Sequence, residues 1–192
     1  MIGVVHWGGN IGSLLNALNR ISVSYSLVKE PDRIRDFDKL ILPGVGNFAA
    51  VMDSLKQQGL LEPLLQEILN GIPYLGICVG MQVLLEGSEE AIGVAGLSLV
   101  KGICRKFKAK KVPQVGFNSV RSKTRYIENG GFYYFVNSYY CDVMENVSVA
   151  IANYEGEFCA ALEKSNIFGV QFHPEKSGEL GLKFLKDWCY AD

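Results

Sequence analysis

Cys78 is the residue whose surroundings most suggest chemistry, because it stands between Gly76 and Gly80 in the segment GICVG. An apolar run precedes it and a predicted helix follows, so the segment is a cysteine version of the G-x-S-x-G nucleophile elbow. Such a turn holds the nucleophile in a strained backbone conformation, for which the flanking glycines leave room. The sulfur would lie at a helix N-terminus, which favours the thiolate, and the N–H of Val79 would face a developing oxyanion. A free cysteine is usually a buried structural residue, so the pentapeptide alone leaves both interpretations open.

A nucleophilic cysteine needs a base, and the chain offers only two histidines, His6 and His173. His173 lies in the segment GVQFHPEKS, at the end of a predicted strand, and Glu175 follows two residues later. A carboxylate at this spacing can orient the imidazole, as the third member of a catalytic triad does. Taken singly, each of these residues fits an ordinary turn better than catalysis. Their coincidence with Cys78 at strand ends favours a Cys78–His173–Glu175 triad.

The segment LPGVGNF, residues 42–48, is a candidate for the second donor of an oxyanion hole. Glycines on both sides of Val45 allow the Val45–Gly46 peptide to turn so that an N–H faces the site. A plain turn before a helix is the alternative, and the segment by itself favours that alternative. The glycine-rich stretch WGGNIGS, residues 7–13, lacks the lysine of a P-loop and the glycine order of a dinucleotide fingerprint, so no nucleotide site is predicted.

Short apolar runs alternate with amphipathic runs in the first half of the chain, and this pattern predicts strands that alternate with helices. The predicted strands are 2–6, 24–28, 39–43 and 72–78, and the predicted helices are 10–20, a stretch beginning at 48, and 60–70. Gly71 is expected to follow the last of these helices as its C-cap. Alternation of this kind indicates a parallel sheet with helices on both faces.

The second half of the chain consists mostly of predicted strands and closes with a helix. These strands are 98–107, 112–120, 131–140, 147–154, 158–164 and 167–172, and the apolar stripe of the final helix is Leu180, Phe184, Leu185 and Trp188. The sequence therefore predicts one domain over residues 1–192, an α/β fold with an open, mostly parallel, flavodoxin-like central sheet and an antiparallel extension. In such sheets the site lies beyond the carboxyl ends of the strands, where Cys78 and His173 fall.

Composition argues against several classes of partner. The formal net charge is −1 without long blocks of like charge, so neither nucleic acid nor a membrane surface is expected. The basic stretch 105–111 fits a solvated edge, although an acidic partner could also contact it. The five cysteines include no C-x-x-C pair, so neither a metal site nor a disulfide framework is predicted. Because no leader peptide and no apolar run of about 18 residues is recognisable, we expect a cytoplasmic protein.

In their order and spacing, LPGVGNF, LGICVGMQ and QFHPEKS resemble the motifs of the class I (triad) glutamine amidotransferases. PQVGFN and YYFVNSYY are similar to two further segments of one group of that family, the glutaminase subunits of imidazole glycerol phosphate synthases. The resemblance implies that Cys78 attacks the side-chain amide of glutamine, that ammonia leaves, and that water hydrolyses the glutamyl thioester. It further implies that Gly46, Gln82 and the Ser138–Tyr139 segment hold glutamine and that no cofactor is needed.

The resemblance also implies a heterodimer partner, a cyclase subunit of (β/α)8-barrel fold that receives the ammonia in histidine biosynthesis. The cyclase would make imidazole glycerol phosphate and aminoimidazole ribonucleotide, and the isolated glutaminase is expected to have low activity. Six positions outside the triad depart from the family pattern: His6, Trp7, Gly12, Gln114, Phe117 and Asn137. These departures leave room for a specialised paralogue that supplies ammonia to another acceptor, for example in sugar amidation. A stand-alone cysteine hydrolase is a second alternative.

Overall fold

The computed structural model describes residues 1–191. Its strands are β1 (Ile2–Val5), β2 (Tyr25–Val28), β3 (Lys39–Leu42), β4 (Tyr74–Ile77), β5 (Gly87–Ser88), β6 (Gly102–Lys106), β7 (Gln114–Ser122), β8 (Gly131–Asn137), β9 (Tyr139–Val143), β10 (Ser148–Asn153), β11 (Glu157–Lys164) and β12 (Ile167–Val170). Its helices are α1 (Gly12–Arg20), α2 (Phe48–Gln57), α3 (Leu61–Leu69), α4 (Val79–Gln82) and α5 (Gly178–Tyr190), with 3-10 turns η1 (Pro31–Asp36) and η2 (Pro174–Lys176).

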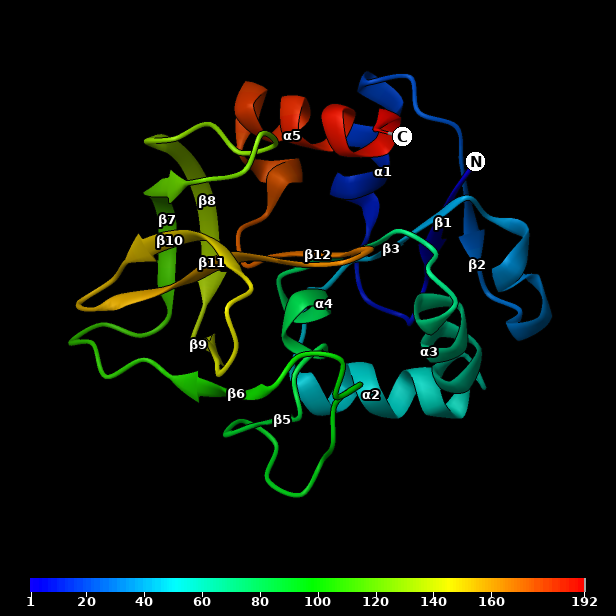
Figure 1. The fold of residues 1–192 in the computed structure, drawn as a ribbon, viewed down its shortest axis with the longest axis horizontal. Helices are drawn as coiled ribbons and strands as arrows, with labels where there is room; N and C mark the ends of the chain where they lie inside the picture. The colour runs from blue at the N-terminus through cyan, green and yellow to red at the C-terminus, as the bar shows by residue number, and fades with distance from the viewer. Residues whose placement is uncertain (192) are drawn as a thin grey trace.

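The centre of the sheet is parallel and has the strand order β2-β1-β3-β4-β12 (Figure 1). This order is the flavodoxin-like one, in which the crevice beyond the strands' carboxyl ends is the usual position of a site. β4 and β12 are far apart in sequence but adjacent in the sheet, with Ile77 opposite Val170. The segments that follow these two strands therefore emerge side by side, and they carry Cys78 and His173.

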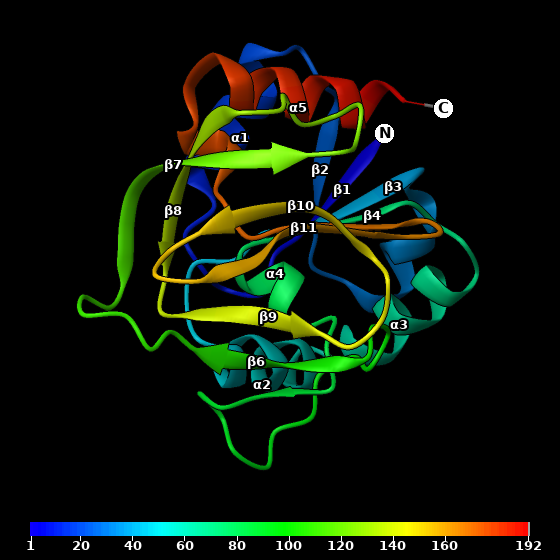
Figure 2. The same cartoon turned by 60° about the vertical axis from the view of Figure 1, so that its left-hand side comes forward.

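Beyond β12 the sheet continues in antiparallel fashion through β11, β10, β7 and β8, while β9 and β6 branch from β11 (Figure 2). The predicted fold class is thus confirmed, with a parallel centre and an antiparallel extension. The prediction of one strand over 131–140 was wrong. The chain breaks at Ser138, whose carbonyl accepts the N–H of Phe107, so that β8 pairs with β7 and β9 pairs with β6.

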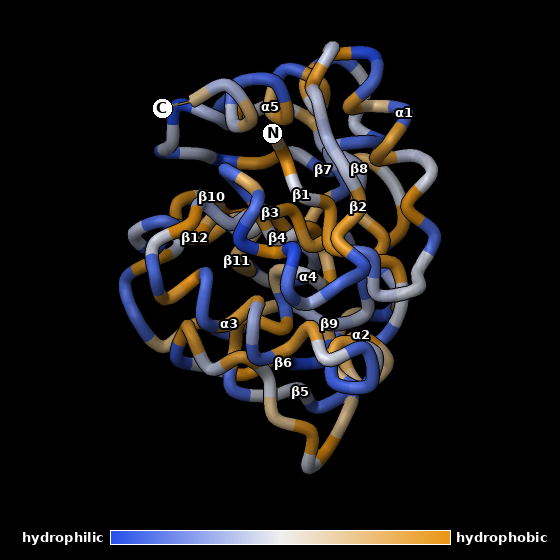
Figure 3. Tube along the Cα trace, turned by 90° about the vertical axis from the view of Figure 1, so that its right-hand side faces the viewer, coloured by the Kyte–Doolittle hydropathy of each residue, from blue (hydrophilic) through white to orange (hydrophobic). Residues whose placement is uncertain are grey.

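Two hydrophobic clusters lie on opposite faces of the parallel strands. α1 and α5 cover one face with buried residues such as Leu18 and Phe184, and α2 and α3 cover the other with Phe48 and Leu64 (Figure 1). Figure 3 shows hydrophobic residues along the central strands and hydrophilic residues in many of the outer turns. Each large apolar side chain buried in this way contributes about 1.5–3 kcal/mol to folding. Within residues 1–191, none of the helices has the length and hydrophobicity required to cross a bilayer.

Candidate active site

Cys78 occupies a tight turn between β4 and α4. Its backbone has φ 54° and ψ −108°, a positive-φ conformation that costs a non-glycine residue about 1–3 kcal/mol. The surrounding glycines are required by contact: a Cβ at Gly76 would lie 2.3 Å from the carbonyl oxygen of Gly80, and one at Gly80 would lie 2.0 Å from that of Leu42. The turn therefore has the geometry of a nucleophile elbow, in which strain lifts one side chain out of the strand–helix junction.

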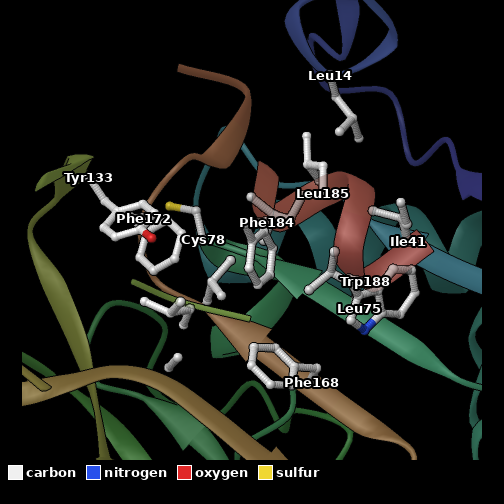
Figure 4. Close-up of a cluster of buried hydrophobic side chains, with 14 of the residues drawn as sticks. Leu14, Ile41, Leu75, Cys78, Tyr133, Phe168, Phe172, Phe184, Leu185 and Trp188 are labelled. Carbon is white, nitrogen blue, oxygen red and sulfur yellow. The ribbon is translucent and has the colours of Figure 1, made fainter. Parts of the chain in front are cut away.

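The sulfur of Cys78 is nearly buried, with 8% of the residue exposed. The residue lies at one edge of the cluster formed by Tyr133, Phe172 and the side chains of α5 (Figure 4). Its Sγ lies 3.9 Å from the carbonyl oxygen of Val136, and the amide Nε2 of Gln171 donates to it at 3.6 Å. The sulfur therefore has two polar contacts, one with a hydrogen-bond acceptor and one with a donor.

His173 and Glu175 form a buried pair beside this sulfur. The ring Nδ1 of His173 lies 2.8 Å from Oε1 of Glu175, and the two side chains are 2% and 7% exposed. The backbone N–H of His173 donates to the carbonyl of Tyr134 at 2.8 Å, and the hydroxyl of Ser177 donates to the carbonyl of His173 at 2.7 Å. These bonds attach the turn η2 to strand β8. The backbone of His173 and its imidazole ring are thus both held by hydrogen bonds.

The electrostatics of the site favour the charged form of His173. Burial by itself lowers the pKa of His173, but the negative charge of Cys78, the hydrogen bond between the two side chains, and the bond and charge of Glu175 outweigh it. Together these effects raise the pKa of His173 from 6.5 to about 10. At neutral pH the ring is therefore an imidazolium beside the sulfur of Cys78.

Three further cysteines, Cys141, Cys159 and Cys189, have raised pKa values. Burial raises the pKa of Cys159 to about 11 and that of Cys189 to about 12, and it raises the pKa of Cys141 as well. These thiols remain protonated at neutral pH and lie within the packed core. Throughout residues 1–191, no group of three or more histidine, cysteine, aspartate or glutamate side chains is arranged to hold a metal ion.

One pocket of about 270 Å³ collects the predicted site residues. Its lining is Val45, Gly46, Cys78, Val79, Gln82, Glu90, Pro113, Val136, Asn137, Ser138, Tyr139, His173 and Lys176. All the residues predicted to bind glutamine or form the oxyanion hole are in this set, whereas Glu175 lies behind His173. Sequence reasoning missed Glu90 and Lys176, which bring one charge of each sign to the pocket. This pairing of charges suits a ligand that carries both an ammonium and a carboxylate group.

The predicted oxyanion donors lie on two sides of the elbow. Met81 and Gln82 donate the first helical hydrogen bonds of α4, both to the carbonyl of Cys78, so the N–H of Val79 is not used within the helix. Val45 and Gly46 lie across the pocket, and Gly46 has φ 149°. This φ lies in the region that glycine adopts without the steric cost that other residues have.

Gln171 is another residue that sequence reasoning missed, although a signal was available. It stands two residues before His173, and alternate residues of an extended segment point to the same side. Its Oε1 accepts a bond of 3.1 Å from Nε2 of Gln82, which also donates to the carbonyl of Tyr139 at 3.0 Å. Gln82 and Gln171 thus connect the pocket wall to the sulfur of Cys78.

The departures from the family pattern occupy different environments. Gln114 and Asn137 are opposite one another in the β7–β8 pair and are only 3% and 5% exposed. Both amide atoms of Gln114 and the Oδ1 of Asn137 lack a hydrogen-bond partner within the described chain. Phe117 lies on the outer face of the same pair and is 59% exposed. Only Asn137 among these three lines the pocket.

Comparison with known families agrees with this geometry. The family model described as glutamine amidotransferase class-I matches residues 8–191, so the chain belongs to the class I glutamine amidotransferases. A solved structure described as a glutamine amidotransferase has the same fold, with a TM-score of 0.80 at 14% identity. The similarity covers 98% of this chain and 97% of that one.

Relatives of higher sequence identity define the group within this family to which the chain belongs. The chain is 44% identical to imidazole glycerol phosphate synthase subunit HisH of Thermus thermophilus, over 92% of this chain and 90% of the relative. It is 41% identical to the subunit of the same name from Methanothermobacter thermautotrophicus, over 98% of this chain and 97% of the relative. Within its class the chain therefore belongs to the HisH family, and the resemblance seen in its motifs is confirmed.

Proposed function

We propose that the chain is the glutaminase subunit of an imidazole glycerol phosphate synthase, hydrolysing glutamine to glutamate and ammonia for histidine biosynthesis. The observation that carries the proposal is the strained elbow that presents Cys78 to the buried His173–Glu175 pair. An activated sulfur beside an imidazolium is suited to attack on an amide carbon followed by protonation of the leaving nitrogen. The relatives named HisH supply the nature of the amide and of the larger enzyme.

In the proposed mechanism the thiolate of Cys78 forms a bond to the side-chain carbonyl carbon of glutamine. The resulting oxyanion accepts hydrogen bonds from the N–H of Val79 and from the Val45–Gly46 peptide. His173 gives its proton to the amide nitrogen, the C–N bond breaks, and ammonia leaves. His173 then takes a proton from water, which attacks the thioester and releases glutamate, while Glu175 holds the ring throughout.

The proposed glutamine site lies between the two charged residues that line the pocket. Lys176 would attract the carboxylate of the substrate and Glu90 its ammonium group. Gln82 and the Ser138–Tyr139 segment would contact the substrate between these charges. A pocket of about 270 Å³ is near the lower end of the range for small-molecule sites, which fits an amino acid.

The proposed partner is a cyclase subunit of (β/α)8-barrel fold, and an exposed apolar surface supports a docking partner. Val115, Phe117 and Phe132 on the outer face of β7 and β8 are 57%, 59% and 59% exposed. Val115 pairs with Val136, which lines the pocket, so this surface continues to the pocket. Contiguous exposed apolar groups of this kind mark interaction sites more often than plain solvent-facing surface. A partner seated here would close the pocket and receive the ammonia away from water.

The test is glutamate release by the full chain mixed with the barrel cyclase of the same organism, with and without the phosphoribosyl substrate of that cyclase. We expect the cyclase and its substrate to stimulate glutamine hydrolysis. Cys78→Ala should abolish glutamine-dependent synthesis while ammonia-dependent synthesis by the cyclase continues. The matched control is Cys189→Ala, because Cys189 is equally buried at 8% exposure but lies in α5 outside the pocket.

Three outcomes would contradict different parts of the proposal. Continued glutamine-dependent turnover in Cys78→Ala would exclude Cys78 as the nucleophile. Glutamine hydrolysis that the cyclase does not stimulate would point to a different ammonia acceptor. Hydrolysis of peptides without any turnover of glutamine would instead favour a stand-alone cysteine hydrolase.

A further inference from the structure

Gln171 contacts the sulfur that the proposed reaction depends on. Its side chain is fully buried at 0% exposure, and its Nε2 donates to Sγ of Cys78 at 3.6 Å. We propose that Gln171 is a further catalytic residue, whose amide N–H stabilises the anionic sulfur of Cys78 and fixes its direction. The inference rests on the proposed role of Cys78 as the nucleophile and adds a second group, besides His173, that would stabilise negative charge on the sulfur.

The orientation of the Gln171 amide is set by hydrogen bonds that connect it, through Gln82, to the backbone carbonyl of Tyr139. Nε2 of Gln82 and Nδ2 of Asn137 both donate to the carbonyl oxygen of Tyr139, each at 3.0 Å. A carbonyl oxygen can only accept, so the donor end of Gln82 must face it. That same nitrogen donates to Oε1 of Gln171 at 3.1 Å. A flipped Gln171 would place two N–H donors against each other, so its Nε2 faces the sulfur.

The two contacts of the sulfur suit different protonation states. The carbonyl of Val136, 3.9 Å from Sγ, can accept the S–H of the neutral thiol but gains nothing from a thiolate. The N–H of Gln171 gains strength when the sulfur is ionised, because charge-assisted hydrogen bonds are about twice as strong as neutral ones. The Gln171 contact therefore shifts the balance between the two states toward the thiolate.

Several titratable groups surround the sulfur of Cys78. The charged partner is His173, while the thiol of Cys141 interacts with Cys78 from the β9 side. Glu90 and Lys176 line the pocket with opposite charges. Gln171 carries no charge, so its contribution is a fixed dipole that does not itself titrate. Its backbone N–H donates to the carbonyl of Ala160 at 2.9 Å, which holds this dipole in place before any substrate arrives.

The test is the pH dependence of Cys78 alkylation by iodoacetamide in the full chain, with the labelled site assigned by peptide mass spectrometry. Gln171→Met keeps the length of the side chain and removes the donor. We expect the pH at which alkylation is half-maximal to rise by about one unit and the rate below that pH to fall about tenfold. The matched control is Gln114→Met, since Gln114 is 3% exposed and its amide makes no hydrogen bond to any group in residues 1–191.

An unchanged midpoint in Gln171→Met, or the same rise in Gln114→Met, would overturn the inference. Gln171→Leu is the second variant if the methionine variant lowers the melting temperature, and it should shift the midpoint in the same direction. Failure here is distinct from failure of the proposed function. An unchanged midpoint would leave glutamine hydrolysis by Cys78 intact, whereas continued turnover in Cys78→Ala would remove the nucleophile itself.

Discussion

Replacement of Cys78 by alanine should lower the pKa of His173 from its value of about 10. Burial opposes the charged form of the ring, and the charge and hydrogen bond of Cys78 are the largest effects that favour it, ahead of Glu175. Alanine removes both contributions of the sulfur and leaves the burial. The imidazolium therefore loses most of its stabilisation, while the Nδ1 bond to Glu175 keeps the ring in position.

The expected size of the effect follows from the charges. Two unit charges about 4 Å apart attract each other by about 4 kcal/mol at an effective dielectric constant of about 20. This energy corresponds to about 3 pH units, since one unit is about 1.4 kcal/mol. The pKa of His173 in the variant is thus expected at about 7.

The assay is an NMR titration of the imidazole Cε1–H signals in the full chain and in Cys78→Ala. Only His6 and His173 contribute such signals, and His6, which lies outside the pocket lining, serves as the internal reference. A value near 10 in the variant would show that the charge on Cys78 does not hold the proton. A value near 7 in the unmodified chain would show that the thiolate–imidazolium pair does not form.

Three further predictions concern the structure around the site. Gly80→Ala should destabilise the chain by about 3 kcal/mol or more, because the new Cβ would lie 2.0 Å from a backbone carbonyl oxygen of β3. Gly12→Ala, with its nearest neighbour at 3.5 Å, should leave the melting temperature unchanged, and equal effects would refute the close-approach argument. Trp7→Phe should lower the free energy of unfolding in urea by about 1–2 kcal/mol, since the indole N–H donates to a buried backbone carbonyl at 2.8 Å; no loss would contradict this. The raised pKa of His173 contributes to the free energy of unfolding, and this contribution is fully present below pH 6.5. It should disappear as the pH rises through about 10, and His173→Ala should lack this part of the pH dependence of stability.

Patterns among neighbouring residues were sufficient to indicate the fold class and the candidate nucleophile. Glycines two residues on either side of Cys78 signal a turn with no room for side chains, and the collisions expected at Gly76 and Gly80 give the physical reason. Glu175 reaches His173 within one turn, so their contact depends only on neighbouring residues. The alternation of apolar and amphipathic runs likewise depends on local burial, which is why it predicted the parallel centre and the helices on both faces.

Contacts between distant segments were decided only by the tertiary structure. The break at Ser138 follows from the pairing of β8 and β9 with different strands, which no local pattern encodes. The position of Gln171 against Cys78 requires β12 to lie beside β4, and the direction of its amide depends on Gln82 and on a carbonyl of β9. Hydrogen-bond direction is a property of the assembled network. The turn at Cys78 is partly local, because Gly76 meets the carbonyl of Gly80 within the same five residues, whereas Gly80 meets the carbonyl of Leu42 from the neighbouring strand β3.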